Sequence, residues 1–387
     1  MTATFKIFHT TKLHMLVTLL VIGLLLTGCQ SSPPAESSQQ NPQENVLSPS
    51  GDNQSEANTP SGSEPPETSD PSDPASAANQ LSDEQLNTMA VNELGDVMVL
   101  MYHIIGDKED EWERTKDNFR NDLKVLYEEG YYLVTARDFV TGTMDVPAGK
   151  TPVILTFDDA TEGHFRFIEG SDGTLTVDPD CAVGIIENFA KEHPDFGIAA
   201  SFYVYYPVPF RQNDHPEWRQ KKYEYLTNLG MEIGNHAYSH ENLSKLTDEE
   251  VQQALMKNIQ STQAILPDYS VDTLALPYGI SPKTKQLAAT GSYEGMQYDH
   301  KGVLLVGSNP APSPFSQDFN LLGIPRIRAA SVPDDFFNQW ISHFQNNPEK
   351  RYISDGDPAS ITIPKELENL VDTERFPDKN IRIYETN

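Results

Sequence analysis

The sequence predicts an α/β fold in which a parallel sheet closes into a barrel. Short apolar runs that favour strands alternate along the chain with segments of helical periodicity, and polar residues directly follow several of these runs. Strands that alternate with helices form parallel sheets. From Leu94 onward the 387-residue chain is long enough to close such a sheet into a barrel. In these barrels the chemistry lies at the carboxyl ends of the strands, which is where the polar residues fall.

Each element of the first half has its own signal. One helix is expected between Asp117 and Gly130, because its apolar residues recur at i, i+4, i+7 and i+8 and glycine ends the pattern. The strands are short apolar runs that stop at polar residues. His103 follows the first strand, and Asp158-Asp159 follow the third. The predicted elements are a strand at 97–102, this helix, and strands at 131–134 and 152–157.

An inserted segment then interrupts the alternation. Glu162–Asp180 is rich in Gly, Asp and Pro, which predicts a loop or a hairpin. Beyond the insert, Thr247 and Glu250 have the spacing of a capping box, which marks the start of a helix. The predicted elements are helices at 181–192, around 218–229 and from 247 to 265, and strands at 199–205, 231–234, 274–276 and 303–306.

The first 28 residues are predicted to be a lipoprotein signal peptide. Two lysines precede the apolar run Leu13–Leu26, which is shorter than the roughly 20 residues that span a bilayer. The run ends in Leu26-Thr27-Gly28-Cys29, which resembles the lipobox of bacterial lipoproteins. This resemblance implies that Cys29 carries acyl chains and anchors the protein to the membrane on its extracytoplasmic side. A simple transmembrane anchor is the alternative.

Residues 29–90 are predicted to be a disordered linker, and residues 91–387 the catalytic domain. From Gln30 to about Ala78 the chain is almost entirely Ser, Pro, Gln, Asn, Glu and Asp, which cannot bury enough apolar surface to offset chain entropy. The linker would separate the membrane from the domain. The second cysteine of the chain, Cys181, lies among apolar residues and is interpreted as a core residue.

The charge balance excludes one class of partner. The chain has 28 Lys and Arg against 57 Asp and Glu, which gives a formal net charge of −29. Nothing in this balance would neutralise phosphates, so nucleic acid is not an expected partner. An acidic surface favours solubility and is compatible with an extracellular location.

Asp159, His236 and His240 are the predicted ligands of one divalent metal ion. The two histidines are four residues apart, so a single turn of backbone can bring both imidazoles to one ion. Two His and one carboxylate leave positions for water and substrate, as in a catalytic site. Zn²⁺ suits this set well, and Co²⁺, Ni²⁺, Mn²⁺ or Fe²⁺ would fit. Because successive residues leave a strand in different directions, the neighbouring Asp158 could stay free as a base.

Four motifs follow one another along the chain: Thr-Phe-Asp-Asp at 156–159, Ala-Ser-Phe-Tyr-Val at 200–204, Glu-Ile-Gly-Asn-His-Ala-Tyr-Ser-His at 232–240, and Pro-Tyr-Gly at 277–279. In this order they resemble the polysaccharide deacetylases of the NodB-homology type, carbohydrate esterase family 4. The resemblance covers roughly Val97 to Arg328. It implies a distorted (β/α) barrel and the removal of N-acetyl groups from amino sugars of a cell-wall or extracellular polysaccharide.

The resemblance also implies roles for individual residues. Asp158 matches the general base, and Asp159 matches the carboxylate ligand beside the two metal-binding histidines. Tyr278, which follows Pro277, matches the residue whose backbone N–H helps to hold the oxyanion.

The general acid has two candidates. One subgroup of the family has a permuted motif order, in which a His after an N-terminal Tyr supplies the acid. Met101-Tyr102-His103-Ile104 resembles that motif, so His103 is the predicted acid. The competing candidate is His343, which lies within an apolar stretch that is predicted to be a packed helix.

The chain departs from the family pattern in two places. The family often has an Arg shortly before Pro-Tyr-Gly that positions the catalytic Asp, and here that place is Ala275. The base then needs another cationic partner, and Arg326, at a predicted strand end, is the candidate. The insert Glu162–Asp180 is expected to reshape the substrate groove. Of the other histidines, His164 is expected to line the site or pack on the insert, and His300 to lie on the surface.

Two alternative functions remain open. One is the hydrolysis of a different amide or ester on the same metal site. The other is a degenerate domain that binds glycan without turnover, and the absence of the Arg at Ala275 favours it.

Overall fold

The structure, a computed structural model, describes residues 80–386. The predicted signal peptide and Cys29 lie outside the described residues, as does most of the predicted linker. The predicted linker end at residue 90 is wrong, because Asp83–Met89 forms helix α1, with a capping box between Ser82 and Gln85 and with Leu86 fully buried. Within the described part, no helix combines the length and the apolar character needed to cross a bilayer.

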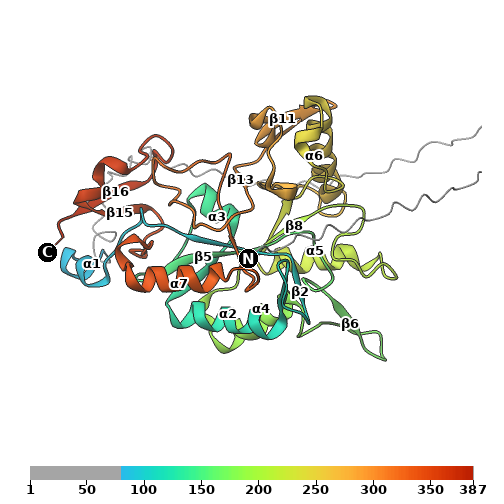
Figure 1. Cartoon of the computed structure of the whole chain (residues 1–387), viewed down its shortest axis with the longest axis horizontal. Helices are drawn as coiled ribbons and strands as arrows, with labels where there is room; N and C mark the ends of the chain where they lie inside the picture. The colour runs from blue at the N-terminus through green and yellow to red at the C-terminus, as the bar shows by residue number, and fades with distance from the viewer. Residues whose placement is uncertain (1–79, 387) are drawn as a thin grey trace, which may run out of the picture. The chain divides into compact units, whose positions relative to one another are not determined.

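The centre of the fold is a sheet of eight strands that pair in parallel throughout (Figure 1). Its order is β13-β10-β9-β8-β5-β1-β14. The eighth strand, β4, lies off this path and pairs with β5. The strands are β1 (Met98–Tyr102), β4 (Tyr131–Val134), β5 (Thr151–Phe157), β8 (Ser201–Val204), β9 (Glu232–Asn235), β10 (Thr273–Ala275), β13 (Gly302–Leu304) and β14 (Ile327–Arg328). The predicted parallel sheet is confirmed, with strand ends within a few residues of those expected.

The two edges of the sheet are joined by one short segment, residues 324–328. On the β13 side, Leu305 N–H donates to Ile324 O at 2.9 Å. On the other side, Ile327 of β14 is in register with Leu100 of β1. The sheet therefore curls on itself, as the predicted distorted barrel requires.

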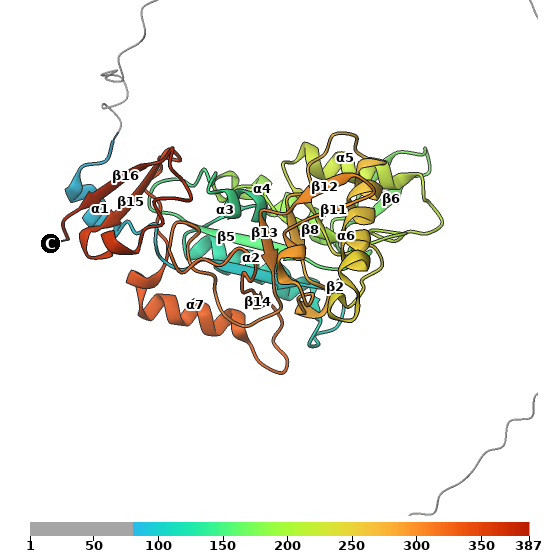
Figure 2. The same cartoon turned by 90° about the horizontal axis from the view of Figure 1, so that it is seen from above.

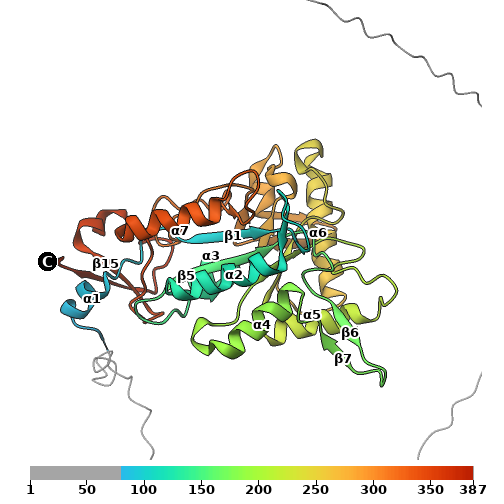
Figure 3. The same cartoon turned by 60° about the horizontal axis from the view of Figure 1, so that its bottom comes forward.

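Helices cover the outside of the sheet, and Figure 3 shows α2 and α4 next to each other. They are α2 (Lys116–Glu128), α3 (Ala136–Thr141), α4 (Ala182–Glu192), α5 (Trp218–Asn228), α6 (Asp248–Gln263) and α7 (Phe336–Asn346). The capping box predicted from Thr247 and Glu250 is present at the start of α6. Cys181 precedes α4 and is buried, as expected of a core residue.

Smaller elements extend from the ends of the barrel. The insert forms the predicted hairpin, and a second hairpin packs on α6 (Figure 1). A parallel pair of strands lies beside α1 at the other end of the described part (Figure 2). These strands are β2 (Ile104–Gly106), β3 (Glu113–Thr115), β6 (Phe167–Glu169), β7 (Leu175–Val177), β11 (Thr290–Tyr293), β12 (Met296–Asp299), β15 (Ser360–Pro364) and β16 (Asn380–Tyr384). Short 3₁₀ helices lie at Pro194–Phe196, Leu243–Lys245, Pro277–Gly279, Lys285–Ala288, Pro348–Lys350 and Lys365–Leu370.

Candidate metal centre and catalytic site

Asp159, His236 and His240 come together at the carboxyl ends of β5 and β9. One ligand atom from each lies within 4.8 Å of the other two. Asp159 Oδ1 is 3.5 Å from His236 Nε2 and 3.4 Å from His240 Nε2. The three residues that were predicted to hold one metal ion therefore form one compact cluster.

The hydrogen bonds of His236 fit a metal ligand. Its Nδ1–H donates to the backbone oxygen of Ala275 at 2.7 Å, which fixes the tautomer and leaves the lone pair on Nε2. This Nε2 is buried and has no hydrogen-bond partner among residues 80–386. A buried nitrogen with a free lone pair, directed at a carboxylate and a second imidazole, is the donor set that Zn²⁺ and similar ions take.

Left-handed backbone turns aim the ligands at one point. Asp159, Ala237 and His240 have φ values of 73°, 56° and 57°, which cost energy in residues other than glycine. The turn after β9 brings His240 back towards His236, so that their ring centroids lie 4.8 Å apart. These strained backbone conformations therefore bring the three ligands together.

Asp158 points in another direction and forms a buried ion pair with Arg326. The Arg326 guanidinium donates from Nη1 and Nη2 to the two carboxylate oxygens, each at 2.7 Å. Arg326 also donates to Leu305 O and to Thr156 Oγ1, which fixes its position. Both side chains are almost completely buried, at 0% and 1% exposed.

This pairing sets the charge of Asp158. Burial by itself would raise the pKa of this carboxyl, but the charge and the hydrogen bonds of Arg326 outweigh it and hold the pKa well below its usual range. Asp158 is therefore ionised throughout the physiological pH range and able to accept a proton.

Ala275 stands at the position where the family often has an arginine. Ala275 is fully buried, and its backbone oxygen holds His236. The guanidinium carbon of Arg326 lies 5.9 Å from the ring centroid of Tyr203, which belongs to the same core cluster as Ala275. A cation therefore reaches the base from the β14 side of the barrel.

His103 follows β1 and lies beside the base. Its Nε2 is 3.9 Å from Asp158 Oδ2, and its side chain is 17% exposed. Burial lowers the pKa of His103, although the charges of Asp158 and Asp159 oppose this shift. The competing candidate, His343, lies on α7 against Trp340 and Phe344, away from the cluster.

Tyr278 lies beside His240. Its ring lies 4.6 Å from that of His240, and its side chain is 59% exposed. It adopts a left-handed backbone conformation (φ 60°) within the turn that Pro277 begins. Its backbone N–H donates to no other residue of the described part, so this amide is available to an oxygen in the site.

A further buried histidine, His300, contacts the segment that carries the two metal-ligating histidines. The expectation that His300 lies on the surface is wrong: it is 1% exposed, and its Nδ1–H donates to Ala288 O at 2.8 Å. Its Nε2 accepts from Asn235 Nδ2 at 3.2 Å. Asn235 Oδ1 in turn accepts from Ala237 N–H at 2.9 Å, inside the turn between the metal-ligating histidines.

We expect His300→Ala to weaken metal binding about tenfold, because loss of outer hydrogen bonds to ligands typically costs that much or more. Without His300, Asn235 loses a partner, and the strained turn at Ala237 is less well held. Titration of the metal-free protein with Zn²⁺ measures the change. His343→Ala on α7 is the matched control and should bind Zn²⁺ as the wild type does. Equal affinity in the two variants would contradict this role.

His164 is packed in the core beside Phe157 of β5 and Phe202 of β8. It is fully buried, its Nδ1 accepts from Thr161 N–H at 3.1 Å, and its ring contacts those of Phe157 and Phe202. Burial lowers the pKa of His164 to about 3, so its imidazole is neutral.

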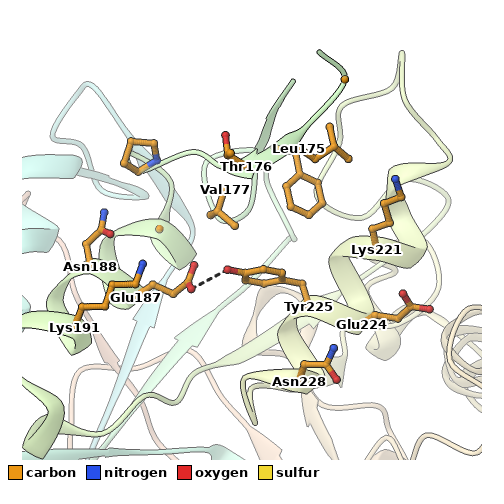
Figure 4. A pocket seen from close by; sticks show the side chains of 14 residues that line it. Leu175, Thr176, Val177, Glu187, Asn188, Lys191, Lys221, Glu224, Tyr225 and Asn228 are labelled. Carbon is orange, nitrogen blue, oxygen red and sulfur yellow. Dashed lines mark hydrogen bonds between the residues drawn. The ribbon is translucent and has the colours of Figure 1, made fainter. Parts of the chain in front are cut away.

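The insert forms a groove of its own. The hairpin β6–β7 lies over α4 and α5, and a groove of about 620 Å³ separates them (Figure 4). Leu175, Val177 and Tyr225 form part of its lining, and Tyr225 donates to Glu187 at 2.8 Å. None of the proposed site residues lines this groove.

Comparisons with known proteins find one family and several solved structures. The family model described as polysaccharide deacetylase matches residues 185–295, which include His236, His240 and Tyr278 but not Asp158. No curated protein matches the chain.

The similar solved structures are distant in sequence. A Streptococcus pyogenes deacetylase, PplD, in complex with acetate is 18% identical, covers 64% of this chain and 97% of its own, and has a TM-score of 0.46. A polysaccharide deacetylase from Bacillus cereus is 18% identical, with coverages of 64% and 68% and a TM-score of 0.45. IcaB from Ammonifex degensii is 16% identical, with coverages of 64% and 96% and a TM-score of 0.44. Residues 185–295 are therefore similar to polysaccharide deacetylases.

Proposed function

We propose that the protein is a metal-dependent hydrolase that removes N-acetyl groups from amino sugars of a cell-wall or extracellular polysaccharide. One observation carries the proposal: an ionised carboxylate, Asp158, is held by Arg326 directly beside the compact cluster of Asp159, His236 and His240. A base next to a three-ligand site with open positions is the arrangement that metal-assisted hydrolysis of an amide needs.

The chemistry divides between the ion and the protein. A divalent ion held by Asp159, His236 and His240 would lower the pKa of a water molecule and polarise the acetyl carbonyl. Asp158 accepts the proton of the attacking water. Because Arg326 makes this carboxylate a weak base, the water has to be acidified before Asp158 can take its proton. Two neighbouring aspartates thus serve two separate purposes.

Two further groups complete the reaction. The backbone N–H of Tyr278 donates to the oxygen that becomes negative when water adds to the carbonyl carbon. His103 then donates a proton to the amide nitrogen as the C–N bond breaks, which releases acetate and a free amine. Burial lowers the pKa of His103, and the ionised carboxylate of Asp158, 3.9 Å away, opposes this shift and so supports the imidazolium form that this step needs.

We further propose Zn²⁺ as the ion and the outer face of the cytoplasmic membrane as the location. Two imidazoles and one carboxylate suit Zn²⁺. The proposed lipid on Cys29 and the polar segment after it would hold the domain at a distance from the membrane, within reach of a wall-bound or secreted polymer.

The decisive experiment measures acetate release by the metal-loaded protein. Chitooligosaccharides, peptidoglycan and poly-N-acetylglucosamine are the substrates to compare. We expect acetate from at least one of them, loss of the activity with a chelator, and recovery when Zn²⁺ is added back. A protein that retains its metal but releases acetate from none of the three would contradict the proposal.

A further inference from the structure

An exposed tryptophan lies next to the proposed acid, on the loop between β2 and β3. The ring of Trp112 meets that of His103 edge to face, with centroids 4.7 Å apart. The Trp112 side chain is 41% exposed, although such a large apolar group ordinarily gains from burial. Nothing in the Asp158 and metal-ligand cluster requires an indole at this position.

Arg328 contacts the Trp112 ring and fixes its position. Arg328 packs against it, with its guanidinium carbon 5.9 Å from the Trp112 ring centroid and 5.4 Å from that of Phe336. Arg328 also donates to the backbone oxygens of Glu111 and Val332, at 3.1 and 2.6 Å. The arginine is 7% exposed, so it acts as a support and not as a surface charge.

The loop itself is fastened to the strand that carries His103. Ile104 N–H donates to Trp112 O at 3.0 Å, and β2 pairs in parallel with β3. Arg328 and Arg326 are two residues apart, so side chains from one short segment support both the base and the tryptophan loop. A ring that is fixed in this way loses little conformational freedom when a ligand covers it.

We propose that Trp112, supported by Arg328, is a sugar-stacking platform that makes the enzyme prefer a polymer to a single sugar. Pyranose rings of β-linked amino sugars present apolar C–H faces, which pack on aromatic rings. Trp112 contacts His103 and Tyr278 contacts His240, so one exposed ring lies next to the proposed acid and the other next to a proposed metal ligand. A sugar on Trp112 is therefore a neighbour of the N-acetylated unit in the same chain. The inference rests on the proposed function and adds a substrate class to it.

Binding tests the platform without turnover. Asp158→Asn, which should block the reaction, serves as the background for calorimetric titration of the metal-loaded protein with N-acetylglucosamine and with its β-1,4-linked pentamer. We expect Trp112→Ala to weaken pentamer binding about tenfold, the equivalent of about 1.4 kcal/mol, and Trp112→Phe to recover most of it. Ile168→Ala, which changes a similarly exposed residue (44%) on β6, is the matched control and should bind as the background does.

Kinetics separate a platform from a merely structural role. In the otherwise wild-type protein, Trp112→Ala should raise KM for the pentamer with a much smaller effect on kcat. A fall in kcat with an unchanged KM would overturn the proposal, because it would mean that Trp112 acts through His103. Pentamer binding that does not differ between the Trp112→Ala variant and the background would overturn it as well. Absence of acetate from the wild type would instead refute the proposed deacetylation, and the binding result would still decide the platform.

Discussion

Replacing Arg326 by alanine is expected to lower the deacetylase rate by about a hundredfold or more and the free energy of unfolding by about 3–5 kcal/mol. The stability loss follows because Asp158 would be left as a buried carboxylate without its cation. The rate loss follows because burial would then raise the pKa of Asp158 against only the weaker opposing charges of His236 and His103, and a protonated base accepts no proton. Acetate release and chemical denaturation measure the two effects.

Conservative and control variants sharpen this test. Arg326→Lys keeps the charge but cannot donate to both oxygens of Asp158 at once, so its activity should fall between those of the wild type and the alanine variant. Arg351→Ala removes another arginine that packs on an aromatic ring, that of Tyr131, and donates to a backbone oxygen. It should keep its activity. A hundredfold loss in Arg351→Ala as well would mean that stability, not the partner of Asp158, limits the rate.

A double variant can test whether an arginine at position 275 replaces Arg326 as the partner of Asp158. In the double variant Ala275→Arg with Arg326→Ala, the cation would reach Asp158 from the place where the family often has it. Because Ala275 is fully buried, the longer side chain needs the space that Arg326 vacates. We expect the double variant to be more active than Arg326→Ala alone. If it is equally inactive, the direction from which the cation approaches the base also matters.

Local patterns in the sequence predicted the elements, because each element is specified by neighbouring residues. The capping box at Thr247 and the helical spacing from Phe119 to Tyr127 act within a few residues of each other, and both helices form where expected. Strand positions followed from apolar runs that are buried on both faces, as in β5. Helix α1 was not predicted, because Leu86 is its only buried residue and one apolar residue after a long polar segment is a weak signal for a helix.

Contacts between distant segments were harder to predict. Arg326 and Asp158 are 168 residues apart, and they could be linked only because both lie at expected strand ends. The sheet order explains their meeting: β14 and β5 flank β1, and Leu100 is in register with both Ile327 and Leu155. His300 carried no such signal. It follows a hairpin, and its burial depends on contacts with Ala288 and Asn235, which are distant in the sequence.

The adjacent aspartates should give opposite results in a metal assay. Asp159→Asn removes the anionic ligand, so we expect it to lose both the metal and the activity. Asp158→Asn leaves all three ligands in place, so it should retain the metal while the rate falls about 10²–10⁴-fold, the usual contribution of a general base. Metal content after gel filtration and acetate release are the two measurements.

Thermal unfolding provides a readout that does not depend on activity. An ion at a hundred times its dissociation constant stabilises the folded state by about 2.7 kcal/mol, provided that it does not bind the unfolded chain. A chelator should therefore lower the melting temperature of the wild type and of Asp158→Asn alike, and leave that of Asp159→Asn unchanged. If Asp158→Asn lost its metal and Asp159→Asn kept it, the two aspartates would have exchanged roles. The buried pair with Arg326 would then hold a ligand, and the 26% exposed Asp159 would be the base.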